Sequence, residues 1–422
     1  MSRPPETAAP ARTASAAHGP VPPVLSVDGL HVTVGGPERV EAVREVSLTI
    51  GPGEAVGLVG ESGSGKSLTC RSVLGVLPPG CAVADGSIVL DGDEPAELTA
   101  LTPKEWESVR GRRLGAVFQD PASYLNPSLT VGRQLSEQLR VGRGLSRTAA
   151  HSRAVDLFAA VGLHGPGAIY HRYPHELSGG MLQRVLIAIA IACEPELLIA
   201  DEATTALDVV VQAEILELLQ RLRSEQGLAL LLVTHDLAVV ARSCDRILVM
   251  YAGEIVEEGP TADVLAAPAH PYTEALLRVA STAEAGTGAL ETIPGGAPET
   301  GAELPGCRFA ERCPYADAEC LAGPVATRLV EPGRRARCVR PAGQPSGRRQ
   351  DAGAAASAEN PSAENPSAEN PSAENPSAEN PSAENPSAEN PSAGNVSGAD
   401  ATAGTGATTA GTPEPEPEGS RV

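Results

Sequence analysis

The sequence predicts a mixed α/β fold that is organised around one glycine-rich loop. Residues 55–59 form an apolar run typical of a buried strand, and residues 67–74 have the composition of a helix. The loop between them follows the pattern G-x-x-x-x-G-K-S and consists of Gly60, Glu61, Ser62, Gly63, Ser64, Gly65, Lys66 and Ser67. Further apolar runs predict the other strands, and helical patterns lie between some of them. These observations favour an α/β sheet that carries the loop.

The residue types in the loop are those that hold a phosphate group. Glycine lets successive backbone N–H groups turn toward an anion, and the N-terminus of a helix adds partial positive charge. Lys66 would reach the β- and γ-phosphates of a nucleotide, while the Ser67 hydroxyl would bind Mg²⁺. A structural turn would give no reason for a lysine and a serine at the start of a helix. We therefore expect a nucleotide-binding site here.

Composition sets outer limits on the protein class. The 422 residues allow two or three domains, and the net charge of −21 includes −11 from residues 351–422, which leaves −10 for the rest. Nothing in this distribution indicates a nucleic-acid partner. The longest apolar runs, 185–193 and 228–233, are too short to cross a bilayer. Residues 1–23 lack the apolar core of a secretory signal, so they are predicted to be a disordered leader on a soluble, cytoplasmic protein.

Ordered structure is predicted to begin near residue 24. Strands are expected at 25–34 and 43–50, and again at 87–92, where an Asp-Gly turn ends the strand. The strand at 113–118 leads into Gln119 and a loop that continues to residue 131. Helices follow at 146–162 and 182–192, and the second is almost wholly apolar.

Two later strands end in polar residues that complement the loop. The strand at 196–200 leads into Asp201 and Glu202; the first carboxylate could hold Mg²⁺ and the second could polarise an attacking water. The alternative is a strand that simply ends in solvated acids. The strand at 228–233 is followed by His235, at the edge where α/β sheets bind ligands. Taken alone, this histidine would more simply be a capping or surface residue.

Residues 177–184, Leu-Ser-Gly-Gly-Met-Leu-Gln-Arg, resemble the signature of the ATP-binding subunits of ABC transporters. Gln119 matches the glutamine loop of that family, residues 206–208 match the D-loop, and His235 matches the switch. The resemblance covers about residues 24–260 and implies an ABC-type P-loop nucleotide-binding domain, with a helical subdomain at about 120–180. It also implies that two such domains sandwich two ATP molecules.

The resemblance assigns roles to individual residues. Glu202, His235 and Gln119 would be catalytic, while Ser67, Gln119 and Asp201 would hold Mg²⁺. The residues that bind ATP would be those of the loop together with Ser178, Gly179, Gly180 and Asp208. Residues 178–180 precede a helix, so they offer a second anion site, which would close on the γ-phosphate held by the other domain.

Four shorter motifs in the sequence resemble those of the peptide and nickel permease branch of the family. The matching phrases are Phe-Gln-Asp-Pro at 118–121, Tyr-Pro-His-Glu at 173–176, Thr-Thr-Ala-Leu-Asp at 204–208 and His-Pro-Tyr-Thr at 270–273. Two positions depart from the family pattern. Val34 stands where an aromatic residue usually stacks on adenine, and Ala203 replaces the proline that usually follows the catalytic glutamate. An alanine there adds a backbone N–H and frees φ, so Glu202 would be held less firmly.

A C-terminal extension is predicted at residues 261–345, with short helices at 262–265 and 273–279 and a loop-like segment at 301–341. Four of the eight cysteines gather in that segment: Cys307, Cys313, Cys320 and Cys338. Thiols clustered in a segment with little apolar mass are what a small metal-stapled region needs. The wide spacing favours a 4Fe-4S cluster over Zn²⁺, because no C-x-x-C pair is present. Four unligated thiols are the alternative.

The last part of the chain, 346–422, is predicted to be a disordered acidic tail. Ser-Ala-Glu-Asn-Pro occurs seven times in residues 357–391, and a five-residue repeat without large apolar groups cannot bury a core. A proline-glutamate run at 413–418 favours an extended chain.

The function that the resemblance implies is ATP hydrolysis that powers import of peptides or a similar solute. The expected partners are a second ATPase subunit, identical or paralogous, two membrane permease subunits and an extracytoplasmic solute-binding protein. The chain would then lie peripherally on the cytoplasmic face of the membrane. The alternative is a soluble ABC ATPase of DNA repair or translation, which usually has two cassettes or a long coiled coil. A third reading, compatible with the first, makes the cysteine region a redox or metal sensor that gates the ATPase.

Overall fold

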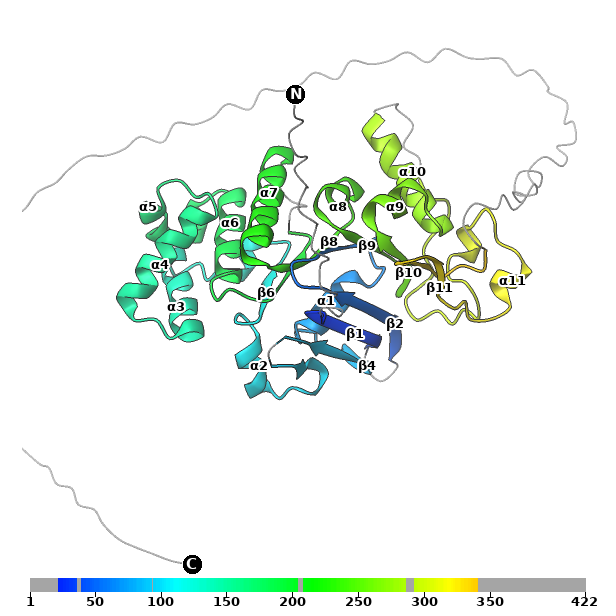
Figure 1. Ribbon diagram of the computed structural model, residues 1–422, viewed down its shortest axis with the longest axis horizontal. Helices are drawn as coiled ribbons and strands as arrows, with labels where there is room; N and C mark the ends of the chain where they lie inside the picture. The colour runs from blue at the N-terminus through cyan, green and yellow to red at the C-terminus, as the bar shows by residue number, and fades with distance from the viewer. Residues whose placement is uncertain (1–21, 36–38, 93, 204–207, 286–291, 341–422) are drawn as a thin grey trace, which may run out of the picture. The chain divides into compact units, whose positions relative to one another are not determined.

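The computed structural model describes residues 22–35, 39–92, 94–203, 208–285 and 292–340 (Figure 1). Nearly all of the predicted leader and tail lie outside the described residues. The strands are β1 Leu25–Val34, β2 Val40–Ile50, β3 Ala55–Val59, β4 Ala82–Leu90, β5 Ala96–Glu97, β6 Leu114–Val117, β7 Leu197–Asp201, β8 Ala229–Thr234, β9 Arg246–Tyr251, β10 Glu254–Pro260, β11 Arg328–Glu331 and β12 Arg334–Ala336.

The helices cover the sheets and fill the connections between strands. The α-helices are α1 Lys66–Val73, α2 Pro103–Val109, α3 Val131–Arg143, α4 Arg147–Ala160, α5 Pro166–Tyr170, α6 Gly179–Ala190, α7 Val209–Gln226, α8 Leu237–Ser243, α9 Thr261–Ala266, α10 Pro271–Ala285 and α11 Ala318–Leu321. Single 3₁₀ turns are η1 Leu98–Ala100, η2 Pro121–Tyr124, η3 Pro174–Glu176 and η4 Ala310–Arg312. Among these helices none is long and apolar enough to cross a membrane.

The larger sheet has the order β11-β12-β10-β9-β3-β8-β7-β6, and its five strands from β9 to β6 are parallel. Every residue of β3, β7 and β8 is buried, which explains why these segments are continuous apolar runs rather than alternating ones. Val59 pairs with Thr234, and Asp201 pairs with Val233. The carboxyl ends of three neighbouring strands therefore meet at one edge of the sheet.

A smaller antiparallel sheet, in the order β2-β1-β4-β5, packs on the other side of α1 (Figure 1). The inward residues of this sheet share one core with the parallel strands and α1. Leu25 and Ile50 of the smaller sheet, Leu58 of β3 and Cys70 of α1 are all fully buried in this core. Burial of apolar surface at about 25 cal/mol per Å² makes such a shared core the main source of stability. The phosphate loop thus stands on a rigid base between two sheets.

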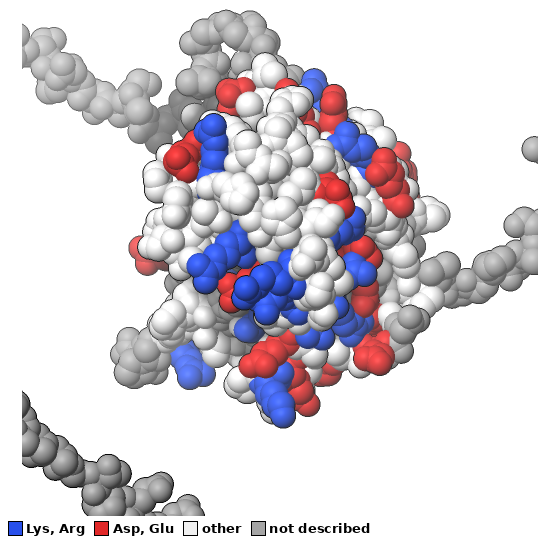
Figure 2. Space-filling view, turned by 90° about the vertical axis from the view of Figure 1, so that its left-hand side faces the viewer, with Lys and Arg blue, Asp and Glu red and all other residues white. Residues whose placement is uncertain are grey.

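Helices α3, α4, α5 and α6 lie together at one end of the molecule (Figure 1). Their core is made of apolar side chains such as Leu135, Phe158 and Val185, none of them exposed. Figure 2 looks onto this end of the protein and shows basic side chains gathered near its centre, with acidic side chains among and around them.

Most predicted elements are present, with shifted ends. The strands predicted at 25–34 and 55–59 are confirmed at their full bounds, and the helix predicted at 146–162 is α4. The prediction that 301–341 is loop-like holds for most of the described residues 301–340, but it missed α11, β11 and β12, which lie there. Strand β12 pairs with β10, with Glu257 opposite Ala336, so it extends the larger sheet. Its sequence, Arg-Arg-Ala, is too short and too charged to reveal a strand by its pattern.

A buried ion pair ties the C-terminal extension to the larger sheet. Glu257, 1% exposed, accepts hydrogen bonds from Arg334 at 2.9 Å and from the backbone N–H groups of Ala269 and His270 at 2.8 and 2.9 Å. His270 is itself buried, and its Nδ1 accepts from the N–H of Tyr272 at 3.1 Å. The segment at 269–272 is therefore fixed by the Glu257 carboxylate of β10, which Arg334 of β12 in turn holds in place.

We predict that His270 makes the fold sensitive to acid. Burial lowers the pKa of its imidazole to about 3 from 6.5, so between these values the unfolded chain binds the proton and the folded protein does not. Stability should fall as pH drops below 6.5, by up to about 1.4 kcal/mol per pH unit from this group. His270→Asn, whose amide oxygen can accept from Tyr272, should lose less stability in urea unfolding between pH 7 and 5. An exposed control, His164→Asn, should behave as the parent; equal slopes for all three proteins would contradict the prediction.

Candidate nucleotide-binding site

The phosphate loop joins β3 to α1, as the sequence predicts. Gly60 and Gly65 have φ of 154° and 108°, a region that side chains rarely adopt. A Cβ at Gly60 would lie 2.1 Å from the carbonyl oxygen of Met250, so the loop needs glycine there for space as well. The first N–H groups of α1 have no partner within the helix, and they point along its axis toward the loop. This is a preformed site for an anion.

Lys66 lies inside the loop and is 5% exposed. Its ammonium group donates hydrogen bonds to the carbonyl oxygens of Gly60 and Glu61, both at 2.9 Å. Burial lowers the pKa of Lys66, while the nearby carboxylates of Glu202 and Asp201 act in the opposite direction. A cation held among oxygen atoms at the head of a helix is suited to bind phosphate.

Ser67 and Asp201 come together from α1 and from the end of β7. The Ser67 hydroxyl donates to Oδ1 of Asp201 at 3.1 Å, and burial raises the pKa of the Asp201 carboxyl, opposed by this hydrogen bond. A hydroxyl and a carboxylate oxygen are hard ligands of the kind that Mg²⁺ binds beside phosphate groups. Gln119 is exposed and lies just past β6, which pairs with β7, so it is one strand further along the same edge.

Glu202 and His235 face each other across the ends of β7 and β8. Nδ1 of His235 lies 3.8 Å from Oε1 of Glu202, and the histidine side chain is 57% exposed. Glu202 has φ of 50°, a strained value for a residue with a side chain, and its N–H donates to the carbonyl of Val233 at 3.0 Å. Ala203 after it is buried. In the family a proline usually follows this glutamate, whereas here Ala203 follows it. The hydrogen bond to Val233 of β8 fixes the backbone at Glu202 instead.

The signature residues 178–180 are placed differently. Ser178 caps α6 by accepting from the N–H of Met181 at 3.4 Å, and a Cβ at Gly180 would lie 2.7 Å from Cγ1 of Val211. Helix α6 stands with the helical subdomain, away from α1 (Figure 1). The structure therefore does not bring these residues to the phosphate loop of their own chain.

Asp208 caps α7, and its carboxylate accepts from the N–H of Val211 at 3.0 Å. The other D-loop residues, Ala206 and Leu207, lie in 204–207, outside the described residues. Val209 and Val210 follow Asp208 and are 80% and 68% exposed. Two large apolar side chains in water next to Asp208 are typical of a contact surface for a partner.

The structure brings Cys307, Cys313, Cys320 and Cys338 around one small cavity of about 20 Å³. All are free thiols, and burial raises the pKa of Cys307 to about 11 and of Cys313 to about 12. Within the described part of the chain, no three His, Cys, Asp or Glu side chains are arranged to hold a metal ion. The predicted convergence of the four thiols is thus present, but the structure gives no support for a 4Fe-4S or Zn²⁺ site formed by them.

Two residues at the loop were not predicted. Arg312 forms a two-point ion pair with Glu61, at 2.9 and 3.0 Å, and the Tyr272 hydroxyl accepts from the Glu61 N–H at 2.8 Å. Tyr272 belongs to the His-Pro-Tyr-Thr motif at 270–273, but the motif gives this residue no role. Nothing in the sequence around Arg312 indicates a partner 251 positions away. Both residues come from the C-terminal extension.

The sheet edge thus combines a phosphate loop, a buried lysine, a serine-aspartate pair and a glutamate with a histidine. Together they define a P-loop ATPase of the ABC class. The family description "ABC transporter" matches residues 43–205, and "Oligopeptide/dipeptide transporter, C-terminal region" matches residues 256–320.

Similar proteins agree with this class. A Brucella melitensis relative whose name describes a peptide import ATP-binding protein is 45% identical over 329 residues, covering 75% of this chain and 97% of the relative. The dipeptide transport ATP-binding protein DppD of Bacillus subtilis is 45% identical over 301 residues, 70% of this chain and 88% of DppD. A dimeric structure of a bacterial ABC transporter cassette is 31% identical, with a TM-score of 0.51, and covers 56% of this chain and 98% of that one. The chain belongs to the ATP-binding subunits of the oligopeptide/dipeptide family of ABC transporters.

Proposed function

We propose that this protein is the ATP-hydrolysing subunit of an importer and powers uptake of peptides or a similar small solute. The observation that carries the proposal is that one chain matches both the ABC transporter family, at residues 43–205, and the oligopeptide/dipeptide transporter C-terminal region, at residues 256–320. Relatives named for peptide and dipeptide transport, at 45% identity, support it. The match at residues 256–320 also favours import over the alternative of DNA repair or translation.

In this proposal each side chain at the sheet edge has a task. The loop residues 60–67 bind the phosphates through backbone N–H groups, and Lys66 neutralises the β- and γ-phosphates. Ser67 and Asp201 would hold Mg²⁺, and Gln119, just past β6, would bind the same ion. Glu202 orients the attacking water, and His235 contacts the γ-phosphate. Their support is the 3.1 Å contact of Ser67 with Asp201 and the 3.8 Å approach of His235 to Glu202.

We propose that two such subunits close on two ATP molecules. Residues 178–180 stand away from the phosphate loop of their own chain (Figure 1), so a nucleotide would meet them only in a dimer. Asp208 and the exposed Val209 and Val210 would lie at the contact between the subunits. A structural relative at 29% identity and TM-score 0.50 was solved as a dimer bound to ADP and phosphate, and covers 56% of this chain and 98% of that one.

The remaining parts of the assembly follow from the family. Two membrane permease subunits would take up the conformational change, and a solute-binding protein on the other side of the membrane would deliver the solute. The segment after Gln119 is suited to contact a permease, because Tyr124 is 51% exposed and stacks on Phe118 with ring centroids 4.7 Å apart. The ATPase would lie peripherally on the cytoplasmic face of the membrane.

A finer proposal concerns the four cysteines. Their thiols line one cavity, and a bound cation would stabilise the thiolate forms that burial disfavours. We propose that they hold one metal centre, either a 4Fe-4S cluster or Zn²⁺. The cavity of about 20 Å³ has room for one atom, so a cluster requires the surrounding turns to move outward.

We predict that protein purified without oxygen carries metal bound to these thiols. A cluster would give a broad visible absorption, and zinc would give one equivalent per chain by elemental analysis. Cys313→Ser should abolish the signal, whereas Cys81→Ser, which changes a thiol outside the group, should keep it. Metal-free protein with all four thiols titratable would contradict the proposal.

We predict that Glu202→Gln binds ATP with little change but loses turnover by about 100-fold or more, because an amide cannot polarise the attacking water. Steady-state phosphate release and binding of a fluorescent ATP analogue measure the two effects separately. Glu194→Gln is a matched control, since Glu194 also has a positive φ, 56°, and lies in surface ion pairs. Loss of ATP binding in Glu202→Gln, or unchanged turnover, would remove Glu202 from the catalytic role.

A further inference from the structure

The C-terminal extension reaches into the phosphate loop at one residue, Glu61. Its N–H donates to the Tyr272 hydroxyl at 2.8 Å, and its carboxylate forms a two-point ion pair with Arg312 at 2.9 and 3.0 Å. Its carbonyl oxygen accepts from Lys66 at 2.9 Å. Backbone and side chain of Glu61 are therefore all fixed, and two of the three contacts come from residues more than 200 positions away.

Arg312 is held as firmly as the residue it binds. Its side chain is 6% exposed. It donates to the carbonyl oxygens of Ile293 and Pro294 at 3.2 and 3.0 Å, and to the Tyr251 hydroxyl at 3.2 Å. Its guanidinium carbon lies 5.7 Å from the ring centre of Tyr251 and 5.9 Å from that of Phe309. A planar guanidinium with so many fixed partners has little freedom to swing away from the loop.

The rings behind Arg312 form a rigid wall. Tyr251, Tyr272 and Phe309 are each no more than 1% exposed, and their ring centres lie 4.5 to 5.4 Å apart. Tyr251 ends β9, a neighbour of β3 in the larger sheet, whereas Tyr272 and Phe309 belong to the extension. The wall therefore joins the extension to the sheet that carries the phosphate loop.

The charge of Glu61 makes this contact important for nucleotide binding. A carboxylate in the loop repels the phosphates that the loop must bind, and it lies close enough to Lys66 to influence that side chain. Arg312 turns the carboxylate toward the extension and neutralises it. The ion pair thus keeps the positive end of α1 and Lys66 available for the phosphates.

We propose that Arg312 is a positioning residue of the ATP site, through which the C-terminal extension sets the affinity of the phosphate loop for ATP. The inference rests on the proposed function of that loop. Arg312 acts through Glu61 and does not touch the nucleotide. The extension is then a working part of the ATP site rather than an appendage to it.

The test compares ATP affinity and turnover in full-length variants. Arg312→Gln should raise the KM for ATP and the Kd of a fluorescent ATP analogue by about tenfold, because Glu61 is left charged and unpaired, while kcat at saturating ATP stays within about twofold. Glu61→Gln/Arg312→Gln should return both constants to within about threefold of the parent, since the repelling charge is gone. A purely structural role for Arg312 would not be rescued by removing its partner.

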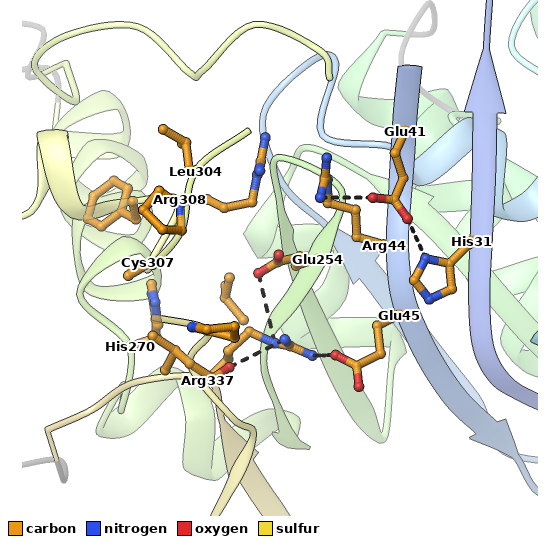
Figure 3. Close-up of a pocket in the computed structure, with 16 residues that line it drawn as sticks. His31, Glu41, Arg44, Glu45, Glu254, His270, Leu304, Cys307, Arg308 and Arg337 are labelled. Atoms are coloured by element: carbon orange, nitrogen blue, oxygen red, sulfur yellow. Dashed lines mark hydrogen bonds and ion pairs between the residues drawn. The ribbon is translucent and has the colours of Figure 1, made fainter. Parts of the chain in front are cut away.

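Arg337→Gln is the matched control. Arg337 also joins the extension to the cassette, by ion pairs with Glu45 at 3.0 Å and Glu254 at 3.9 Å, but these lie in the pocket beside β2 and β10 and do not involve the phosphate loop (Figure 3). The KM of the Arg337→Gln variant for ATP should equal that of the parent protein. If Arg312→Gln does not fold, Arg312→Lys, which keeps the charge without the two-point geometry, should raise KM by a smaller factor.

Unchanged KM in Arg312→Gln, or no recovery in the double variant, would overturn the inference. In either case the proposed function stands if the parent protein hydrolyses ATP and Glu202→Gln does not. If the parent protein itself does not hydrolyse ATP, the proposed function is wrong.

Discussion

The set of hydrogen bonds and ion pairs that fixes Glu61 is the interaction on which the structure of the phosphate loop depends. One residue of the phosphate loop is bound by Lys66 from inside the loop and by Tyr272 and Arg312 from the C-terminal extension. Glycine-rich loops have high conformational freedom, so a loop that must present several N–H groups to one anion needs outside support. Here the extension, joined to the sheet by buried aromatic rings, provides that support.

The same logic explains how the rest of the site is built. Parallel strands β3, β7 and β8 deliver the loop, the carboxylates and the histidine to one edge, because their register aligns Val59 with Thr234 and Asp201 with Val233. Glu202 and His235, which we propose to act in hydrolysis, lie on short turns just beyond buried strands, where burial fixes the backbone. Glu202 has a strained φ of 50° in this position, and the hydrogen bond from its N–H to Val233 of β8 maintains it.

Much of the fold and of the candidate site could be predicted from the sequence. The glycine spacing around Lys66 and the apolar run before Asp201 are local patterns whose meaning follows from elementary chemistry, whereas the signature at 177–184 gains its meaning from its resemblance to a known family. The contact between Arg312 and Glu61 could not be predicted, because it joins distant positions and an isolated arginine has many partners open to it. Strands β11 and β12 were missed since short, charged strands show no alternation. The convergence of the four cysteines around one cavity was predicted, but in the described part of the chain their side chains are not arranged as ligands of a metal ion.

The central claim is that nucleotide binding and the extension are physically linked, and hydrogen exchange measures that link directly. If the loop and the extension are coupled through Glu61, MgATP must stabilise both, since coupling between two sites is reciprocal. In the full-length protein, adding MgATP should slow amide exchange in peptides that cover residues 60–67 and also in those that cover 305–315. Slower exchange in 60–67 alone, with 305–315 unchanged, would contradict the claim.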